Sequence, residues 1–546
     1  MNGRRAYRIC EQMRNKQSVW QGLFDSAVRY GRTQAEEGDG IGRDADVGEE
    51  RRDPINTYIS TRCERLATGI YSNAINSGQR FFRFAVKNEK KYTTTRVKDW
   101  LSGAEDAVAN ALKGSNFFKA AAQAVDDLVI LGTAPCGIFW EDGEPVFRNY
   151  SVQKGVYLGT NNRGDIDTIC IYMNFTAKQA IQEFGEDKVA ESVRNAREDQ
   201  NRIFEYVQLV YPKSAFGEIV DKSRADHRSM PFGSLYVEVE TKRIMRQEGF
   251  SSFPFAVPRW KVETGETYGR SPAMRCVADA MSLNRVEHDI ADIATFSANP
   301  PIAVPAACKD FKMLEGYANK MPVNDLRGAI WAYQPPTNIP MLESYIERRK
   351  QNVDDTCLAK VFSPLGDEMK SNVTMYEASA RMHLHAQDIS PYIVNFQNDF
   401  LEVVVRRVLV LLVEHGLLEE PPEEIYDVQM QVKYISPLDS MLNQGETAKV
   451  QQAFLQLSQV FQAIGSVPNA YLDEYVDTVR MGLFFLRANG VPENMLRSES
   501  EIKEAVGARR AEAKQLQQQM IQAQMVKPID VSKAPQDGSP MAEYGM

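Results

Sequence analysis

Residues 269–301 read GRSPAMRCVADAMSLNRVEHDIADIATFSANPP, and this stretch decides the architecture that we expect for the chain. Ser271 is a favourable N-cap, and Pro272 suits the first helical turn, where its missing N–H costs nothing. The proline pair that begins at Pro300 ends the helical pattern. The sequence therefore predicts a helix over 271–298, about 42 Å long at 1.5 Å per residue.

Further elements follow this helix toward the C-terminus. The segment 299–342 is rich in proline and mixed in pattern, which is compatible with a small α/β insertion, and a second helix is expected over 343–361. A polar break follows at 362–373. The next part, 374–435, predicts a long helix with a core-like apolar stripe and then a strand, with Pro391 expected to kink or interrupt the helix.

The part that precedes the first helix, 1–270, changes character along its length. An amphipathic helix is expected near 7–30, and the pattern over 55–131 is helical. From about Cys136 short alternating runs predict a β-rich region. One helix interrupts it, opened by the capping box Thr176-Ala-Lys-Gln, in which two side chains satisfy free N–H groups at the helix start.

The C-terminal part, 436–525, is predicted to be helical and ends in a Gln-rich stretch. The composition of 526–546 is that of a disordered tail. Taken together, the patterns predict an α+β chain that is mostly helical. A length of 546 residues provides material for several domains, and 43% hydrophobic and 25% charged residues are ordinary for a folded protein.

The cysteines and the apolar runs indicate the environment of the chain. Seven cysteines occur without a C-x-x-C pair, which favours buried apolar residues in a reducing compartment over disulfides or a zinc site. The N-terminus lacks the apolar core of a signal peptide. The most apolar run, residues 403–413, is too short to cross a bilayer and contains two arginines, so we expect no membrane contact.

The formal net charge of −9 argues against a protein that coats nucleic acid through bulk attraction. Such a surface needs clustered Lys and Arg, and the sequence shows no dominant basic stripe. Any contact with DNA is expected to be local or weak.

Motifs for catalysis, cofactors or metals are absent from the sequence. It contains no G-x-x-x-x-G-K-[ST], the loop that would cradle phosphates. His383 and His385 stand two residues apart, so on a helix they would point about 200° away from each other and could not share a metal. We therefore expect no enzyme activity, no cofactor and no metal.

Three blocks carry a resemblance to a known family. They are 258–274 (PRWKVETGETYGRSPAM), which runs into the long helix, then 434–438 (YISPL) and 490–502 (GVPENMLRSESEI). In this order and at these separations they resemble the portal, or head-to-tail connecting, proteins of podoviruses, the short-tailed bacteriophages. The similarity covers about residues 1–525.

The resemblance implies a virion protein, assembled in the host cytoplasm, that forms a ring, usually of twelve subunits, at one capsid vertex. Double-stranded DNA would be packaged and ejected through the ring. The implied partners are the large terminase subunit, a tail adaptor and tail proteins, and the major capsid protein with scaffolding or internal core proteins.

The segments found above match the portal-type fold that the resemblance implies. They map onto its parts as follows: wing at 1–270 and 374–435, two-helix stem at 271–298 and 343–361, clip at 299–342, tunnel loop at 362–373, helical crown at 436–525, and tail at 526–546.

Packaged DNA must slide through such a ring, and each phosphate held by a basic side chain is a contact to be broken. A ring of twelve would multiply the charge of each chain twelvefold, and an acidic channel would repel the duplex. The candidate channel residues are, in the stem, Asp279, Glu287, Asp289 and Asp292, and, in the tunnel loop, Glu368, Lys370, Ser371 and Asn372. Aromatic residues beside charge suit a protein interface, which in the clip gives Lys309, Phe311, Lys312, Lys320, Arg327 and Trp331.

Two other classes of protein remain open at this point. A scaffold or internal head assembly protein would be largely helical and poor in aromatic residues, whereas this chain has a β-rich region and 10% aromatic residues. A DNA-packaging enzyme would hydrolyse ATP, and the missing phosphate loop argues against it. ATP hydrolysis and images of the purified particles would separate the three.

Overall fold

The computed structural model divides into two compact units, Met1–Leu442 and Asn443–Met546, and the elements named below lie in the first. The residues that the structure describes are 1–32, 56–75, 80–86, 95–197, 199, 202–221, 223, 227–298, 302–303, 331–332, 339–358, 388–423 and 430–434, with 456, 481–483, 502, 505 and 507–508 in the second unit.

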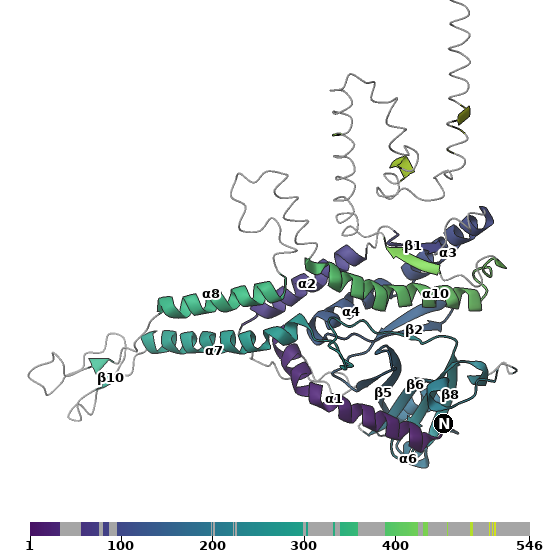
Figure 1. The fold of residues 1–546 in the computed structure, drawn as a ribbon. Helices are drawn as coiled ribbons and strands as arrows, with labels where there is room; N and C mark the ends of the chain where they lie inside the picture. The colour runs from purple at the N-terminus through teal and green to yellow at the C-terminus, as the bar shows by residue number, and fades with distance from the viewer. Residues whose placement is uncertain are drawn as a thin grey trace, which may run out of the picture. The chain divides into compact units, whose positions relative to one another are not determined.

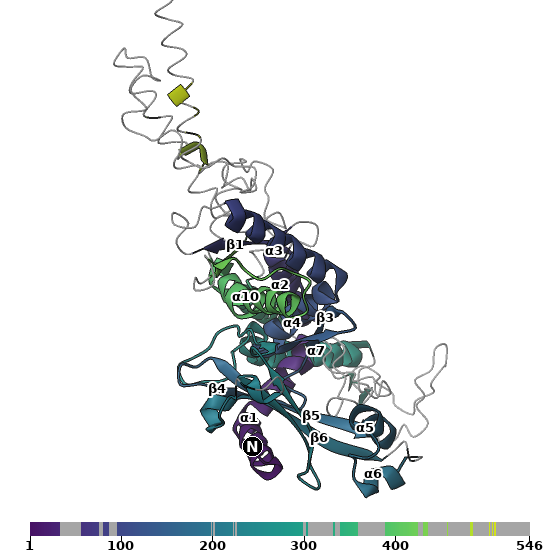
Figure 2. The same ribbon diagram turned by 90° about the vertical axis from the view of Figure 1, so that its right-hand side faces the viewer.

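A five-stranded antiparallel sheet forms one layer of the first unit. Its strands follow chain order, and they are β4 (Val156–Thr160), β5 (Ile166–Thr176), β6 (Ile203–Pro212), β7 (Phe232–Glu238) and β8 (Ile244–Phe250). The helix α1 (Gly3–Gly31) packs on one face, and α5 (Ala177–Phe184) and α6 (Glu191–Asn195) pack on the other (Figure 2). Short 3-10 turns, η1 (Lys213–Phe216) and η2 (His227–Ser229), lie between β6 and β7.

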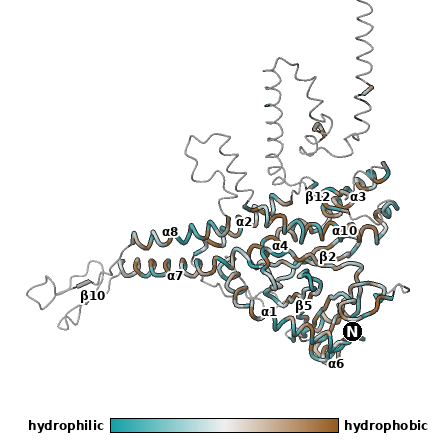
Figure 3. Tube along the Cα trace, in the orientation of Figure 1, coloured by the Kyte–Doolittle hydropathy of each residue, from teal (hydrophilic) through white to brown (hydrophobic). Residues whose placement is uncertain are grey.

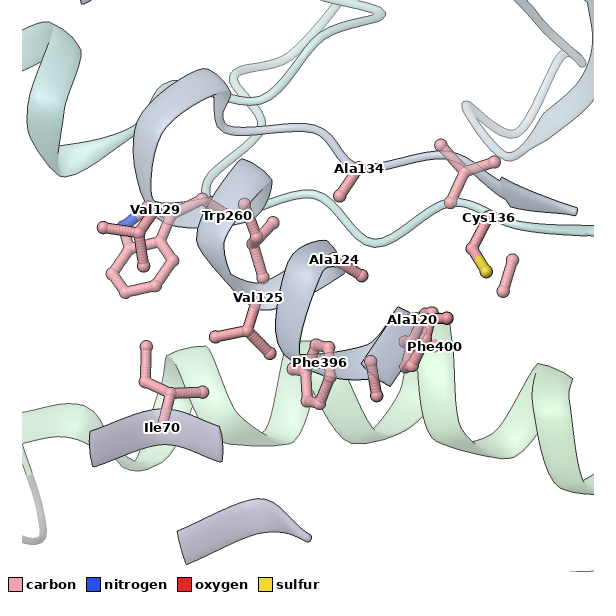
Figure 4. Packing of buried hydrophobic residues seen from close by; sticks show 14 of the residues in the cluster. Ile70, Ala120, Ala124, Val125, Val129, Ala134, Cys136, Trp260, Phe396 and Phe400 are labelled. Atoms are coloured by element: carbon pink, nitrogen blue, oxygen red, sulfur yellow. The ribbon is translucent and has the colours of Figure 1, made fainter. Parts of the chain in front are cut away.

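A helical layer holds the main core. It contains α2 (Tyr58–Ala74), α3 (Thr95–Gly114), α4 (Phe117–Leu131) and a helix that is described from residue 388, continues through the π-helical turn η3 (Gln397–Leu401) and ends as α10 (Glu402–Glu414). Beside it lie the sheet β3-β2-β9 (Glu144–Asn149, Cys136–Glu141 and Phe255–Ala256) and the pair β1 (Phe82–Val86) and β12 (Met430–Tyr434). Phe396 and Phe400 pack against α4 in this core (Figure 4).

Two long helices leave the core side by side, α7 (Pro272–Ala298) and α8 (Ile339–Thr356) (Figure 1). Between them in sequence stand the paired strands β10 (Ile302–Ala303) and β11 (Trp331–Ala332). Figure 3 shows α8 as largely hydrophilic along its length. We call this pair of helices the arm.

Predictions that rest on local signals are confirmed. The helix expected near 7–30 is α1, the capping box at Thr176 opens α5 with both of its hydrogen bonds, and the helix expected over 271–298 is α7. The β-rich region is present from Cys136, and the apolar stripe of 374–435 is buried from Ile393 to Leu411. Mixed helix and strand, as expected, make up the described chain.

Three predictions need correction. The helical pattern over 55–131 is wrong at 82–86, which is strand β1, because Phe-Arg-Phe-Ala-Val alternates and finds a partner in β12, distant in sequence. Over the described residues 388–396 Pro391 does not interrupt the helix, and an irregular turn lies at 397–401 instead. The second arm helix begins at Ile339 rather than 343, since Pro340 suits a first turn, and its last residue is Thr356.

Among the described helices, none combines the length and the apolar character that crossing a bilayer requires.

Candidate functional site

The arm is attached to the core at a junction formed by the segment 258–274. Ser271, fully buried, donates its hydroxyl hydrogen to the Ile130 carbonyl over 2.7 Å and accepts from the Met274 N–H over 2.9 Å. It thus caps α7 and ties the helix to α4 in one residue. Two residues earlier, the Gly269 N–H donates to the Thr133 hydroxyl over 2.8 Å.

Two glycines make this junction possible because their backbones cross in contact. Gly132 ends α4 in the left-handed region at φ 72°, which favours glycine. A Cβ added at Gly132 would lie closer than 3.0 Å to the Gly269 carbonyl oxygen, and one added at Gly269 would lie equally close to the Gly132 carbonyl oxygen. Any side chain at either position would therefore drive the two segments apart.

Trp260 connects the same segment to a third element. Its ring stacks on Tyr392 with centroids 4.4 Å apart, and its backbone N–H donates to the Gly132 carbonyl over 2.9 Å. Figure 4 shows its indole beside Val129 of α4 and above the helix that carries Phe396. The segment 258–274 thus fixes the direction in which α7 leaves the core.

The second arm helix is held at its base by polar contacts to α2. The Arg62 guanidinium lies 2.7 Å from the Asp354 carboxylate, and the Tyr58 hydroxyl donates to the same carboxylate over 2.8 Å. Burial, and then the hydrogen bond to Asp354 and its negative charge, raise the pKa of Tyr58 against the opposing effect of Arg62. Breaking these contacts would free the base of α8 from α2.

The two helices also meet through a pair of cysteines at the base. The Sγ atoms of Cys276 and Cys357 lie 3.8 Å apart, and both side chains are buried. Contact with Cys357, together with burial, raises the pKa of the Cys276 thiol. The six cysteines that the structure describes are all buried and free, in agreement with the expectation of small core residues.

Beyond the base the arm has no core of its own. On α7 no described side chain after Leu283 is buried, and on α8 none is buried from Pro340 to Asn352. Large apolar side chains are exposed here: Met281 by 47%, Met341 by 66% and Tyr345 by 36%. A helix pair that buries so little is marginally stable alone, so this part of the arm suits packing against other protein.

The four acidic residues predicted for the stem fall into two groups. Asp279 faces α8 and pairs with Arg349 over 2.8 Å, and the Glu287 carboxylate accepts a hydrogen bond from the Asn56 amide. These two carboxylates are therefore engaged within the chain. Asp289 and Asp292 are exposed to solvent.

The remaining predicted site residues are not brought together by the structure. The tunnel-loop residues Glu368, Lys370, Ser371 and Asn372 lie outside the described residues, and so do Lys309, Phe311, Lys312, Lys320 and Arg327 of the clip. Of the clip residues Trp331 alone is placed, and only through the backbone of β11, which pairs with β10. These predictions remain untested.

Within the described part of the chain, no group of three or more His, Cys, Asp or Glu side chains is arranged to hold a metal ion. The described residues do assemble a well-anchored, exposed pair of helices.

We compared the chain with models of known protein families. The model for the bacteriophage head to tail connecting protein matches residues 4–496, which is most of the chain. The chain belongs to this family. It is therefore a structural component of the phage virion that connects head and tail.

Two relatives of this head to tail connecting protein align over most of their length. One is the "Probable portal protein" of Bordetella phage BPP-1, 24% identical over 440 residues, which are 79% of this chain and 78% of the relative. The other is the "Portal protein" of Salmonella phage epsilon15, 24% identical over 400 residues, which are 71% of each chain. Both matches agree with the resemblance drawn from the three sequence blocks.

One surface of this family member was missed at the sequence level. The exposed face of α1 carries Arg4, Arg5, Arg8 and Lys16, so the expectation of no dominant basic stripe is wrong for this helix. The signal was present in the spacing of RRAYRICEQMRNK, residues 4–16, where the basic positions fall between the buried ones.

Proposed function

We propose that the chain is the portal subunit of its phage: copies close into a ring, twelve by the resemblance, around a channel through which double-stranded DNA enters and leaves the capsid. The family match and the two relatives named as portal proteins support this proposal. The ring occupies one vertex of the capsid and joins head to tail.

The structural observation that carries the proposal is the arm. An anchored pair of helices with exposed Met281, Met341 and Tyr345 gains stability when a neighbouring copy covers these side chains. Because the arm of one subunit would pack against the arm of the next, the contact is heterologous and closes into a ring when the rotation between copies closes.

The exposed acidic residues of α7 suit a channel wall. Asp289 and Asp292 are exposed, and repeated around a ring they would repel the phosphates of a passing duplex. Lys370, with Glu368, Ser371 and Asn372, is proposed to supply weak local contacts from the tunnel loop at 362–373. The duplex would thus be confined without being held.

The other parts are assigned by the resemblance. The clip, predicted at 299–342, is proposed to dock the large terminase during packaging and a tail adaptor afterwards. Its last residues belong to α8, which begins at Ile339. The wing at 1–270 and 374–435 would face the capsid protein and scaffolding or internal core proteins. The crown at 436–525 would face the interior of the head.

Replacing Met281 and Met341 together by Glu is expected to leave a folded subunit that no longer forms rings. Both side chains are exposed in the single chain, so the fold tolerates the change, whereas burying two unpaired carboxylates between copies costs several kcal/mol. Sedimentation velocity of the purified variant measures whether it assembles, and circular dichroism checks that it is folded.

The matched control is Ile219→Glu, the same chemical change at a side chain that is 91% exposed and outside the arm. It should assemble as the unmodified chain does. Rings formed by the double variant would show that the arm is not the contact between copies.

A further inference from the structure

The first turns of α1 present two different faces. On the inner face Ala6, Cys10 and Met13 are buried against the five-stranded sheet, and Gln17 is buried beside the Val152 carbonyl. The spacing of three to four residues between them is that of one helical stripe. The opposite face of the same turns is left in solvent.

The exposed face consists mainly of basic and amide side chains, with Glu11 as its one carboxylate. Its exposed residues include Arg4, Arg5, Arg8, Gln12, Asn15 and Lys16. At 100° per residue these positions fall within one side of the helix. Glu11 is the one acidic residue among positions 1–18, which also hold Arg14 at the edge of the face.

The charge of this segment is opposite to that of the chain. Residues 1–18 contain five Lys or Arg and one Glu, a formal charge of +4 in a chain of −9. Within the described part of the chain, Arg4, Arg8 and Lys16 form no ion pair, so their charges are not neutralised. The positive end of the α1 dipole lies at the same place and adds to the field.

We propose that this basic face of α1 is a binding surface for the phosphate backbone of double-stranded DNA, separate from the channel. From Arg4 to Lys16 the face extends about 18 Å at 1.5 Å per residue, which matches about five base pairs at 3.4 Å each. Arg, Lys and side-chain amides are the groups that contact phosphates without reading sequence. The surface would hold DNA weakly and at any sequence.

The composition of the face favours DNA over an acidic protein segment. Protein interfaces have a fully buried apolar core with aromatic side chains. On this face Val19 is the one large apolar side chain that is strongly exposed, and no aromatic residue stands among the exposed positions from 4 to 19. A surface dominated by basic and amide side chains matches a polyphosphate.

The position of the face separates it from the proposed channel wall. The basic turns lie at the N-terminal end of α1, over the five-stranded sheet at the lower right of Figure 1. The arm extends from the core toward the left of the same view. DNA bound here would be DNA outside the channel, such as the packaged genome around the ring. The inference goes beyond the proposed function, and a chain that fails to form rings can still be tested for it.

The test is the binding of a mixed-sequence 30-base-pair duplex to the full chain across a salt series. The variant replaces Arg4, Arg5, Arg8 and Lys16 by Gln. We expect its affinity to fall about tenfold or more at 0.1 M salt, and the slope of log K against log salt to shrink by about 3 to 4, near 0.9 for each lost phosphate contact.

A control variant removes the same formal charge from the opposite side of the same sheet. It replaces the exposed residues Lys178, Lys188, Arg194 and Arg197 of the α5–α6 region by Gln, and its affinity should match that of the unmodified chain. Equal losses in both variants would show a bulk charge effect and overturn the proposal. So would an unchanged duplex affinity, or tighter binding of poly-L-glutamate than of the duplex, which would assign the face to an acidic protein.

Discussion

Replacing Gly269 by Ala is expected to prevent the chain from folding into a soluble subunit. The added Cβ would meet the Gly132 carbonyl oxygen inside 3.0 Å and the Trp260 backbone nitrogen at 3.0 Å. Both are backbone atoms, which cannot move aside as a flexible side chain would. Overpacking usually costs about 1–3 kcal/mol, and here the cost should reach or exceed about 3 kcal/mol because α4 and α7 must separate. Soluble yield and thermal unfolding measure the effect.

The matched control is Gly22→Ala in α1. A Cβ at Gly22 meets nothing within 4 Å, so this change should stabilise the chain by about 0.5–1 kcal/mol through helix propensity. A Gly269→Ala protein that unfolds at the same temperature as the unmodified chain would mean that the junction is not built on this crossing.

Deleting residues 364–372 is expected to leave ring assembly intact while abolishing DNA packaging or retention. In the proposed portal these residues form the tunnel loop, which contributes contact with the duplex and no contact between copies. The stem helices α7 and α8 keep their anchors to the core, among them the Arg62–Asp354 ion pair, because those contacts lie outside the deletion. Counting full and empty heads by electron microscopy measures packaging.

A variant in which Gly and Ser replace 364–372 at the same length separates loss of the loop from strain in a shortened chain. It should pack DNA as poorly as the deletion. Loss of rings in both variants would place these residues in a structural interface, and full heads in both would remove them from the path of the DNA.

Much of the fold could be predicted because its signals are local. Ser271 with Pro272 marks the start of α7, and Thr176 with Gln179 marks the start of α5, since each cap is satisfied within one turn. Strand β1 was missed because its alternating pattern spans only five residues between helical segments, and its partner β12 lies far away in the sequence.

The candidate site was predicted only in part. Helical spacing identifies the acidic residues of α7 but does not say which of them meet other parts of the chain. Asp279 and Glu287, which do, could therefore not be told from Asp289 and Asp292. The basic face of α1 was missed because net charge averages over the chain, while a surface potential depends on which residues are exposed together. The role of Gly269 needed the structure, since its partner Gly132 is remote in sequence.

The central claim is that copies of this chain close around a hole that double-stranded DNA crosses. Electron-microscopic images of the purified chain, averaged as end views and side views, test it most directly. The account predicts rings, twelvefold by the resemblance, with an axial hole and with α7 and α8 of every subunit beside that axis. Particles that stay single chains under all capsid-assembly conditions, or rings whose arms point away from the axis, would contradict it.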